Sequence, residues 1–103
     1  MSEQYATAFE QWCPDGTCYT RVSVDGPTLG VQLESTIAKL SGSQIAARLM
    51  ACNDVAYLRG RVAMRQAFEK EPGMRSLEGL ETQADLNAAL KRLEQFAPKD
   101  DQG

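Results

Sequence analysis

The run from Ser41 to Glu71 constrains the fold of this chain most, because it contains no proline and only two glycines, Gly42 and Gly60. It predicts one long helix, which would reach roughly 45 Å at about 1.5 Å per residue. A compact domain of a hundred residues has a radius of gyration of about 13 Å, so it cannot cover such a helix with its own material. We therefore expect part of the apolar surface of this helix to need a second chain.

The start of this helix is marked by Ser41 and Gln44, which match a capping box, and Pro72-Gly73 predicts its end. One apolar row along the helix becomes small toward its C-terminal end. Small side chains on one face permit another helix to approach closely. We therefore predict a dimer interface at Ala56, Gly60, Ala63, Met64 and Ala67.

Three strand-like segments precede the helix: Gln4–Trp12, Thr17–Val24 and a run from Leu29 to Glu34. They are separated by two turn signals, Pro14-Asp15-Gly16 and Asp25-Gly26-Pro27. The second and third segments alternate apolar and polar residues, as half-buried strands do. Short turns between such strands predict an antiparallel meander whose apolar face the helix covers.

A second, shorter helix is predicted after the long one. Thr82 and Asp85 form a candidate N-terminal cap, and an apolar stripe runs from Leu86 to Ala97 before Pro98. The expected fold class is α+β, with a three-stranded meander, a long helix and a C-terminal amphipathic helix. We divide the chain into 1–73 (meander and long helix), 74–98 (linker and second helix) and 99–103 (polar tail).

The charge of the chain is unevenly placed. The formal net charge is −3, without the overall basic character typical of nucleic-acid binders. Residues 41–70 nevertheless carry five basic and two acidic side chains, a local charge of +3. At 100° per residue the basic groups fall into two rows. They fit a solvated surface, an acidic protein partner or nucleic acid, and the candidate contacts are Arg48, Arg59, Arg61 and Arg65.

The chain has three cysteines and no histidine, which limits the catalytic chemistry that it could perform. Without histidine, the Ser-His, Cys-His and His-metal arrangements of catalysis are excluded. Cys13 and Cys18 are expected to be ordinary hairpin residues, with a cross-hairpin disulfide as one alternative. A three-cysteine metal site with Cys52 is a further alternative, although the paired ligand spacing of structural zinc sites is missing. We predict no enzyme, no catalytic residue, no cofactor and no metal ligand.

Neither the N-terminus nor any other segment predicts export or membrane insertion. MSEQYATAFEQW has no basic region followed by an apolar one, and no apolar run approaches about 20 residues. We expect a cytoplasmic protein with reduced thiols and no membrane partner.

The stretch from Thr20 to Phe68 resembles the YbaB/EbfC family of small nucleoid-associated proteins. Three motifs carry the resemblance: Val22-Ser23-Val24-Asp25-Gly26, Leu29-Gly30-Val31-Gln32-Leu33 and Leu40-Ser41-Gly42-Ser43-Gln44-Ile45. The DNA-binding members begin with a long charged helix, whereas here a strand-like segment starts by Tyr5. The chain is therefore more similar to the divergent YbaB-like accessory proteins of actinobacterial type VII (ESX) secretion, of the EspH kind.

This resemblance implies a dimeric, non-enzymatic protein-binding module, accessory or chaperone-like in type VII secretion. The dimer would be a homodimer or a heterodimer with a related chain, with a protein client. The alternative that the family implies is a nucleoid-associated DNA-binding protein.

Overall fold

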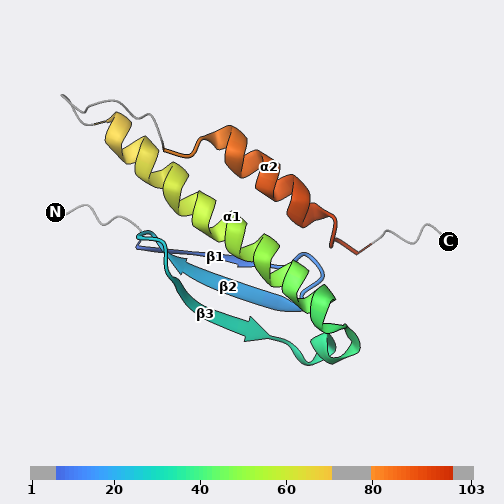
Figure 1. Ribbon diagram of the computed structural model, residues 1–103. Helices are drawn as coiled ribbons and strands as arrows, with labels where there is room; N and C mark the ends of the chain where they lie inside the picture. The colour runs from blue at the N-terminus through green and yellow to red at the C-terminus, as the bar shows by residue number, and fades with distance from the viewer. Residues whose placement is uncertain (1–6, 71–79, 99–103) are drawn as a thin grey trace.

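The computed structural model of the chain describes residues 7–70 and 80–98. Within these residues a three-stranded sheet is followed by a short 3-10 helix and two α-helices (Figure 1). The predicted α+β class is therefore confirmed. The elements are β1 (Ala8–Trp12), β2 (Cys18–Ser23), β3 (Thr28–Leu33), η1 (Ser35–Lys39), α1 (Gly42–Glu69) and α2 (Gln83–Glu94).

The strands form the predicted antiparallel meander in the order β1-β2-β3. Each hairpin closes on a glycine with positive φ, Gly16 at +76° and Gly26 at +117°, a conformation that residues with a Cβ rarely adopt. The predicted first strand began at Gln4; the structure shows it from Ala8, and residues 1–6 lie outside the described residues.

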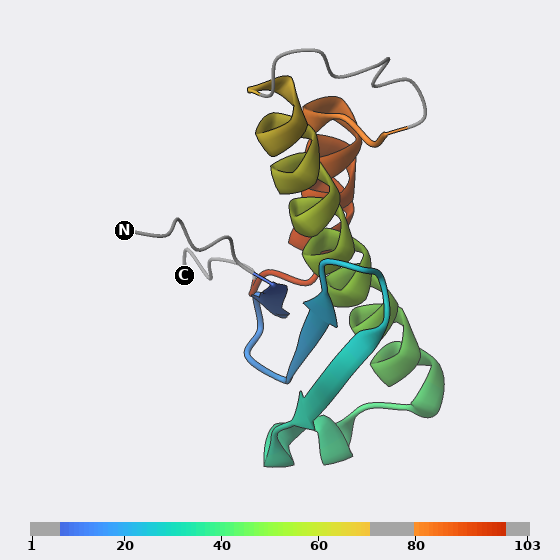
Figure 2. The same ribbon diagram turned by 90° about the vertical axis from the view of Figure 1, so that its left-hand side faces the viewer.

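One face of the sheet packs against α1. On β2 the side chains of Cys18, Thr20 and Val22 are buried, while those between them are not. This period of two is what a strand with one covered face requires. Beneath α1 lie β1 and β2, whereas β3 lies to one side of the helix (Figures 1 and 2).

The long helix α1 begins and is capped as predicted. Ser41 is its N-cap, and the reciprocal bonds of the capping box with Gln44 are both present. The helix has 28 residues and ends at Glu69; the predicted stop at Pro72-Gly73 lies outside the described residues. The molecule is elongated, with extents of 54 × 26 × 26 Å and a radius of gyration of 16.0 Å, against about 13 Å for a compact chain of this length.

The second helix lies along α1 (Figures 1 and 2), and it borders the first hairpin. Its predicted cap is present, since Thr82 and Asp85 form a capping box. Leu86, Ala89 and Leu93 are buried and join the core under α1. The helix ends at Glu94, so Ala97, the last residue of the predicted stripe, is exposed. Neither described helix is long and apolar enough to cross a membrane.

Candidate functional site

The outer strand β3 is the least covered part of the fold. All six of its residues are exposed, including Leu29 at 57%, Val31 at 51% and Leu33 at 50%. Val31 pairs with Thr20, and Leu33 with Cys18, so the side chains of Val31 and Leu33 lie on the face of the sheet that α1 covers elsewhere. Because α1 packs mainly over β1 and β2, this row of apolar side chains is left open to solvent.

The backbone of β3 has an open edge as well. Glu34 donates its N–H to the Thr17 carbonyl at 2.9 Å, so the residue after β3 directs its backbone groups toward β2. Antiparallel ladders alternate, and Gln32 and Gly30 therefore point their backbone groups toward β2 too. Val31 and Leu33 direct theirs outward, whereas at Leu29 the register with β2 shifts. Val31 and Leu33 thus present both apolar side chains and unpaired backbone groups.

A groove of about 400 Å³ runs between β3 and α1. Met50 of α1, 67% exposed, lies across it from Val31, and Thr28 closes one end by donating to Asn53 at 2.8 Å. The lining residues are Thr20, Thr28, Val31, Leu49, Met50, Asn53 and Asp54. The open side of β3 and this groove form one apolar surface, which we call the β3 surface: Leu29, Val31, Leu33 and Met50.

The dimer interface predicted from the small-residue row needs a correction at Ala56 and Gly60. Ala56 is fully buried in the chain's own core. A Cβ at Gly60 would lie 3.2 Å from Phe9 Cδ2 and 3.6 Å from Val24 Cα, so the small row admits the chain's own sheet and not a second helix. Ala63, Met64 and Ala67 are half-buried farther along the helix.

The four candidate arginines all bond within the chain. Arg48 Nε pairs with Asp15 Oδ2 at 2.8 Å, and its guanidinium lies 4.7 Å from the centre of the Phe96 ring. Arg59 donates to Gln11 Oε1 at 3.1 and 3.2 Å. Each of these two residues connects α1 to the first hairpin.

The other two arginines, Arg61 and Arg65, bond to the residues that come just before α2. Arg61 pairs with Glu81 at 2.9 Å, and this hydrogen bond lowers the pKa of Glu81. Arg65 donates to the Leu80 carbonyl at 3.2 Å and pairs with Glu69 at 3.9 Å. The arginines therefore serve the packing of this chain, and they do not line up as one basic surface.

The three cysteines, expected to be unremarkable, meet in the core. Cys13 follows β1, Cys18 opens β2 and Cys52 lies on α1, and all three are free and buried. Their sulfur atoms lie within 4.8 Å of one another. Burial raises the pKa of Cys13 to about 11, helped by a hydrogen bond to the Asp15 carboxylate. Burial also raises the pKa of Cys52 well above its usual value.

Asp15 connects this cluster to the surface. Its Oδ1 accepts from the Thr17 hydroxyl at 2.6 Å and the Thr17 N–H at 3.1 Å, and its Oδ2 accepts from Arg48. Burial acts to raise the pKa of Asp15, but the hydrogen bonds from Thr17, Arg48 and Cys13 outweigh it and hold the pKa well below the usual range. Asp15 is therefore an ionised anchor between the first hairpin and α1.

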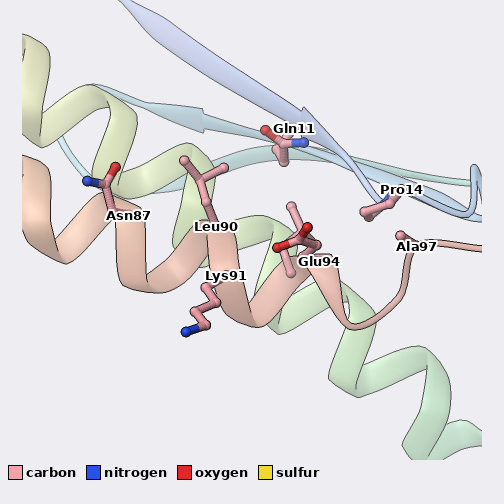
Figure 3. A pocket seen from close by; sticks show the side chains of 8 residues that line it. Gln11, Pro14, Asn87, Leu90, Lys91, Glu94 and Ala97 are labelled. Atoms are coloured by element: carbon pink, nitrogen blue, oxygen red, sulfur yellow. The ribbon is translucent and has the colours of Figure 1, made fainter.

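A second groove, of about 550 Å³, lies between α2 and the first hairpin (Figure 3). Leu90 points from α2 toward β1, whereas Lys91 points away from it. Gln11 lines the groove but its side-chain oxygen is taken by Arg59. The groove therefore lacks a set of convergent polar groups that could recognise a ligand.

Comparison of the chain with known protein families, curated proteins and solved structures gave no match.

Proposed function

We propose that this chain is a non-enzymatic protein-binding module that acts as a homodimer, joined edge to edge through β3. The observation that carries the proposal is the β3 surface, which combines the unpaired outer edge of β3 with apolar side chains that α1 leaves uncovered. Such an edge is a template for pairing with another strand, and natural proteins protect it with charge, proline or a bulge. The six residues of β3, TLGVQL, contain neither charge nor proline. Its register with β2 shifts at Leu29, between the pairs Arg21–Gly30 and Val22–Thr28, so the regular part of the edge runs from Gly30 to Leu33.

A second copy of the chain fits this edge better than an unrelated strand. With a two-fold axis at Val31, antiparallel pairing sets Val31 against its own copy and Leu33 against the irregular Thr28–Leu29 segment of the other chain. The backbone groups of Val31 point outward, so the pair at the axis supplies about two hydrogen bonds. Val31 and Leu33 of both chains lie on one face of the resulting six-stranded sheet, and the same surface serves both copies, as an isologous interface requires.

The pairing also avoids repulsion between like charges. In this register Glu34, the residue after β3, lies opposite Thr28 of the other chain, and β3 itself carries no charge. The acidic residue next to β3 therefore faces a neutral partner, although the chain as a whole is acidic. Because the interface brings no like charges together, its hydrogen bonds and apolar contacts are not offset by electrostatic cost.

The client-binding role follows from the shape of the dimer. Two α1 helices would stand on the same face of the joined sheet, with the apolar side chains of both β3 strands between them. Burial raises the pKa of Cys13 and of Cys52, which disfavours their thiolate forms and supports binding over covalent catalysis, since the thiolate is the nucleophile. The resemblance to YbaB-like accessory proteins supports an accessory or chaperone-like role in type VII secretion.

The dimer is tested by Val31→Lys. It places two ammonium groups against each other at the two-fold axis, and we expect the dimer dissociation constant to rise by at least about 100-fold, since a like-charge contact costs several kcal/mol. Sedimentation or light scattering over a dilution series measures it. Gln32→Lys is the matched control, because Gln32 directs its side chain to the other face and its backbone toward β2.

The wild-type chain should be dimeric at micromolar concentration, and Gln32→Lys should leave it so. Association through β3 would be refuted if the wild-type chain were a well-folded monomer at every concentration. It would also be refuted if Val31→Lys and Gln32→Lys raised the dimer dissociation constant equally.

A further inference from the structure

We propose that Cys13, Cys18 and Cys52 form a binding site for one monovalent copper ion, held by three sulfur atoms in the core. The three side chains converge from three elements of the fold, and their sulfur atoms lie within 4.8 Å of one another. All three residues are at most 2% exposed. The ion would connect the first hairpin to α1 inside the core.

The distances suit a metal bound by three sulfurs. A metal–sulfur bond of about 2.3 Å places three ligands in a trigonal plane about 4.0 Å apart. The widest sulfur separation in the cluster exceeds this by less than about 1 Å, which side-chain rotation can close. The Cys13 N–H also donates to the Cys18 carbonyl at 2.8 Å, so the two hairpin ligands are held in fixed positions relative to each other.

The number and type of ligands favour monovalent copper over zinc. Thiolate ligands select soft ions such as monovalent copper, whereas structural zinc sites almost always have four ligands. Within the described residues no fourth histidine, cysteine or carboxylate joins the cluster. The nearest carboxylate, Asp15, already binds Thr17 through one oxygen and Arg48 through the other.

Binding of the ion releases protons and transfers no electron. Each sulfur that binds as a thiolate releases one proton to solvent, and copper enters and stays monovalent. The bound thiolates leave net negative charge in the core. Arg48 is linked to the site through Asp15, the carboxylate that accepts a hydrogen bond from the Cys13 thiol and pairs with the guanidinium.

The test is an oxygen-free titration of the reduced full chain with monovalent copper in competition with bicinchoninate. We expect one equivalent to be retained, and X-ray absorption should give three sulfur ligands at about 2.3 Å. Each single substitution of Cys13, Cys18 or Cys52 by serine should lower the affinity by on the order of 100-fold or more, given that even outer-shell changes cost 10–100-fold.

Val55→Ala is the control for a loosened core, because Val55 is also fully buried on α1 but brings no sulfur. It should retain the copper. Retention of copper by the cysteine variants, loss of copper to the competitor by the wild type, or tighter retention of Zn²⁺ in a parallel titration would each overturn the site. The number of sulfur ligands is measured by X-ray absorption on the wild-type chain and does not depend on whether a variant folds. A number other than three would overturn the proposed site.

Discussion

At the scale of single residues, the hydroxyl of Thr20 lacks a hydrogen-bond partner among the described residues although it is buried. It is the one such side-chain polar atom in the described part of the chain. Replacing such a hydroxyl by a methyl group removes a desolvation penalty of about 1–3 kcal/mol. Thr20→Val should therefore stabilise the protein by about 1 kcal/mol and raise the unfolding midpoint by about 4–8 °C.

Thr17→Val is the matched comparison, because Thr17 is also buried but its hydroxyl donates to Asp15 at 2.6 Å. There the same exchange should lower the midpoint in thermal unfolding followed by circular dichroism. If both substitutions destabilised the protein to the same extent, the Thr20 hydroxyl would have to be bonded in solution.

At the scale of elements, the ion pair between Asp15 and Arg48 attaches the first hairpin to α1. Both side chains are less than 20% exposed, at 18% and 16%, and Asp15→Asn should lower the free energy of unfolding at pH 7 by about 1–3 kcal/mol. Because the pKa of Asp15 is depressed in the folded state, its contribution is present above the unfolded value of about 3.9. It is lost as the pH falls below that value.

Urea unfolding at pH 7 and at successively lower pH measures this difference, which should shrink below pH 4. Asp25→Asn is the control, since exposed Asp25 also precedes a glycine in a hairpin turn, and it should change stability by under about 0.5 kcal/mol. A difference between wild type and Asp15→Asn that stays constant down to pH 2 would contradict the role of the ionised carboxylate.

The elements themselves could be predicted because their signals are local. Both capping boxes and both glycine turns lie within a few residues of the element that each delimits, and the period of two in β2 is read directly from the sequence. The residue that packs against Gly60 could not be predicted from such local signals. A small residue on a helix permits close approach of any neighbour, and only the tertiary packing shows that this neighbour is Phe9.

The cysteine cluster was expected only as an alternative, because the three cysteines lack the paired ligand spacing of structural zinc sites. A signal was nevertheless present in the sequence: Cys13 and Cys18 flank one hairpin turn, Cys18 lies on the apolar face of its strand, and Cys52 lies on the apolar row of the helix. Combined with the expectation that the helix covers the sheet, these positions bring three sulfurs to one end of the core. The contacts that Arg48, Arg59 and Arg61 make within the chain could not be predicted either, because their partners Asp15, Gln11 and Glu81 are distant in sequence.

At the scale of the whole molecule, the proposed dimer determines what kind of client can bind. Adjacent strands lie about 4.8 Å apart, so two α1 helices over β1 and β2 of each chain would stand roughly 15–20 Å apart. Packed helices approach to about 8–10 Å. One further helix therefore fits between them, on a floor of apolar β3 side chains with Met50 at either wall. We expect the client to bind as an amphipathic helix with its apolar face toward this floor.

This expectation is tested by a photo-crosslinking residue in place of Met50, introduced into the chain in its native cell. Crosslinked client residues, identified by mass spectrometry, should recur at spacings of three and four, because these positions share one face of a helix. The same probe in place of Arg92, exposed on α2 away from the β3 surface, should give no such series. Crosslinks at every second residue would instead indicate an added strand, and they would contradict both the helical client and a β3 edge already occupied by a second copy.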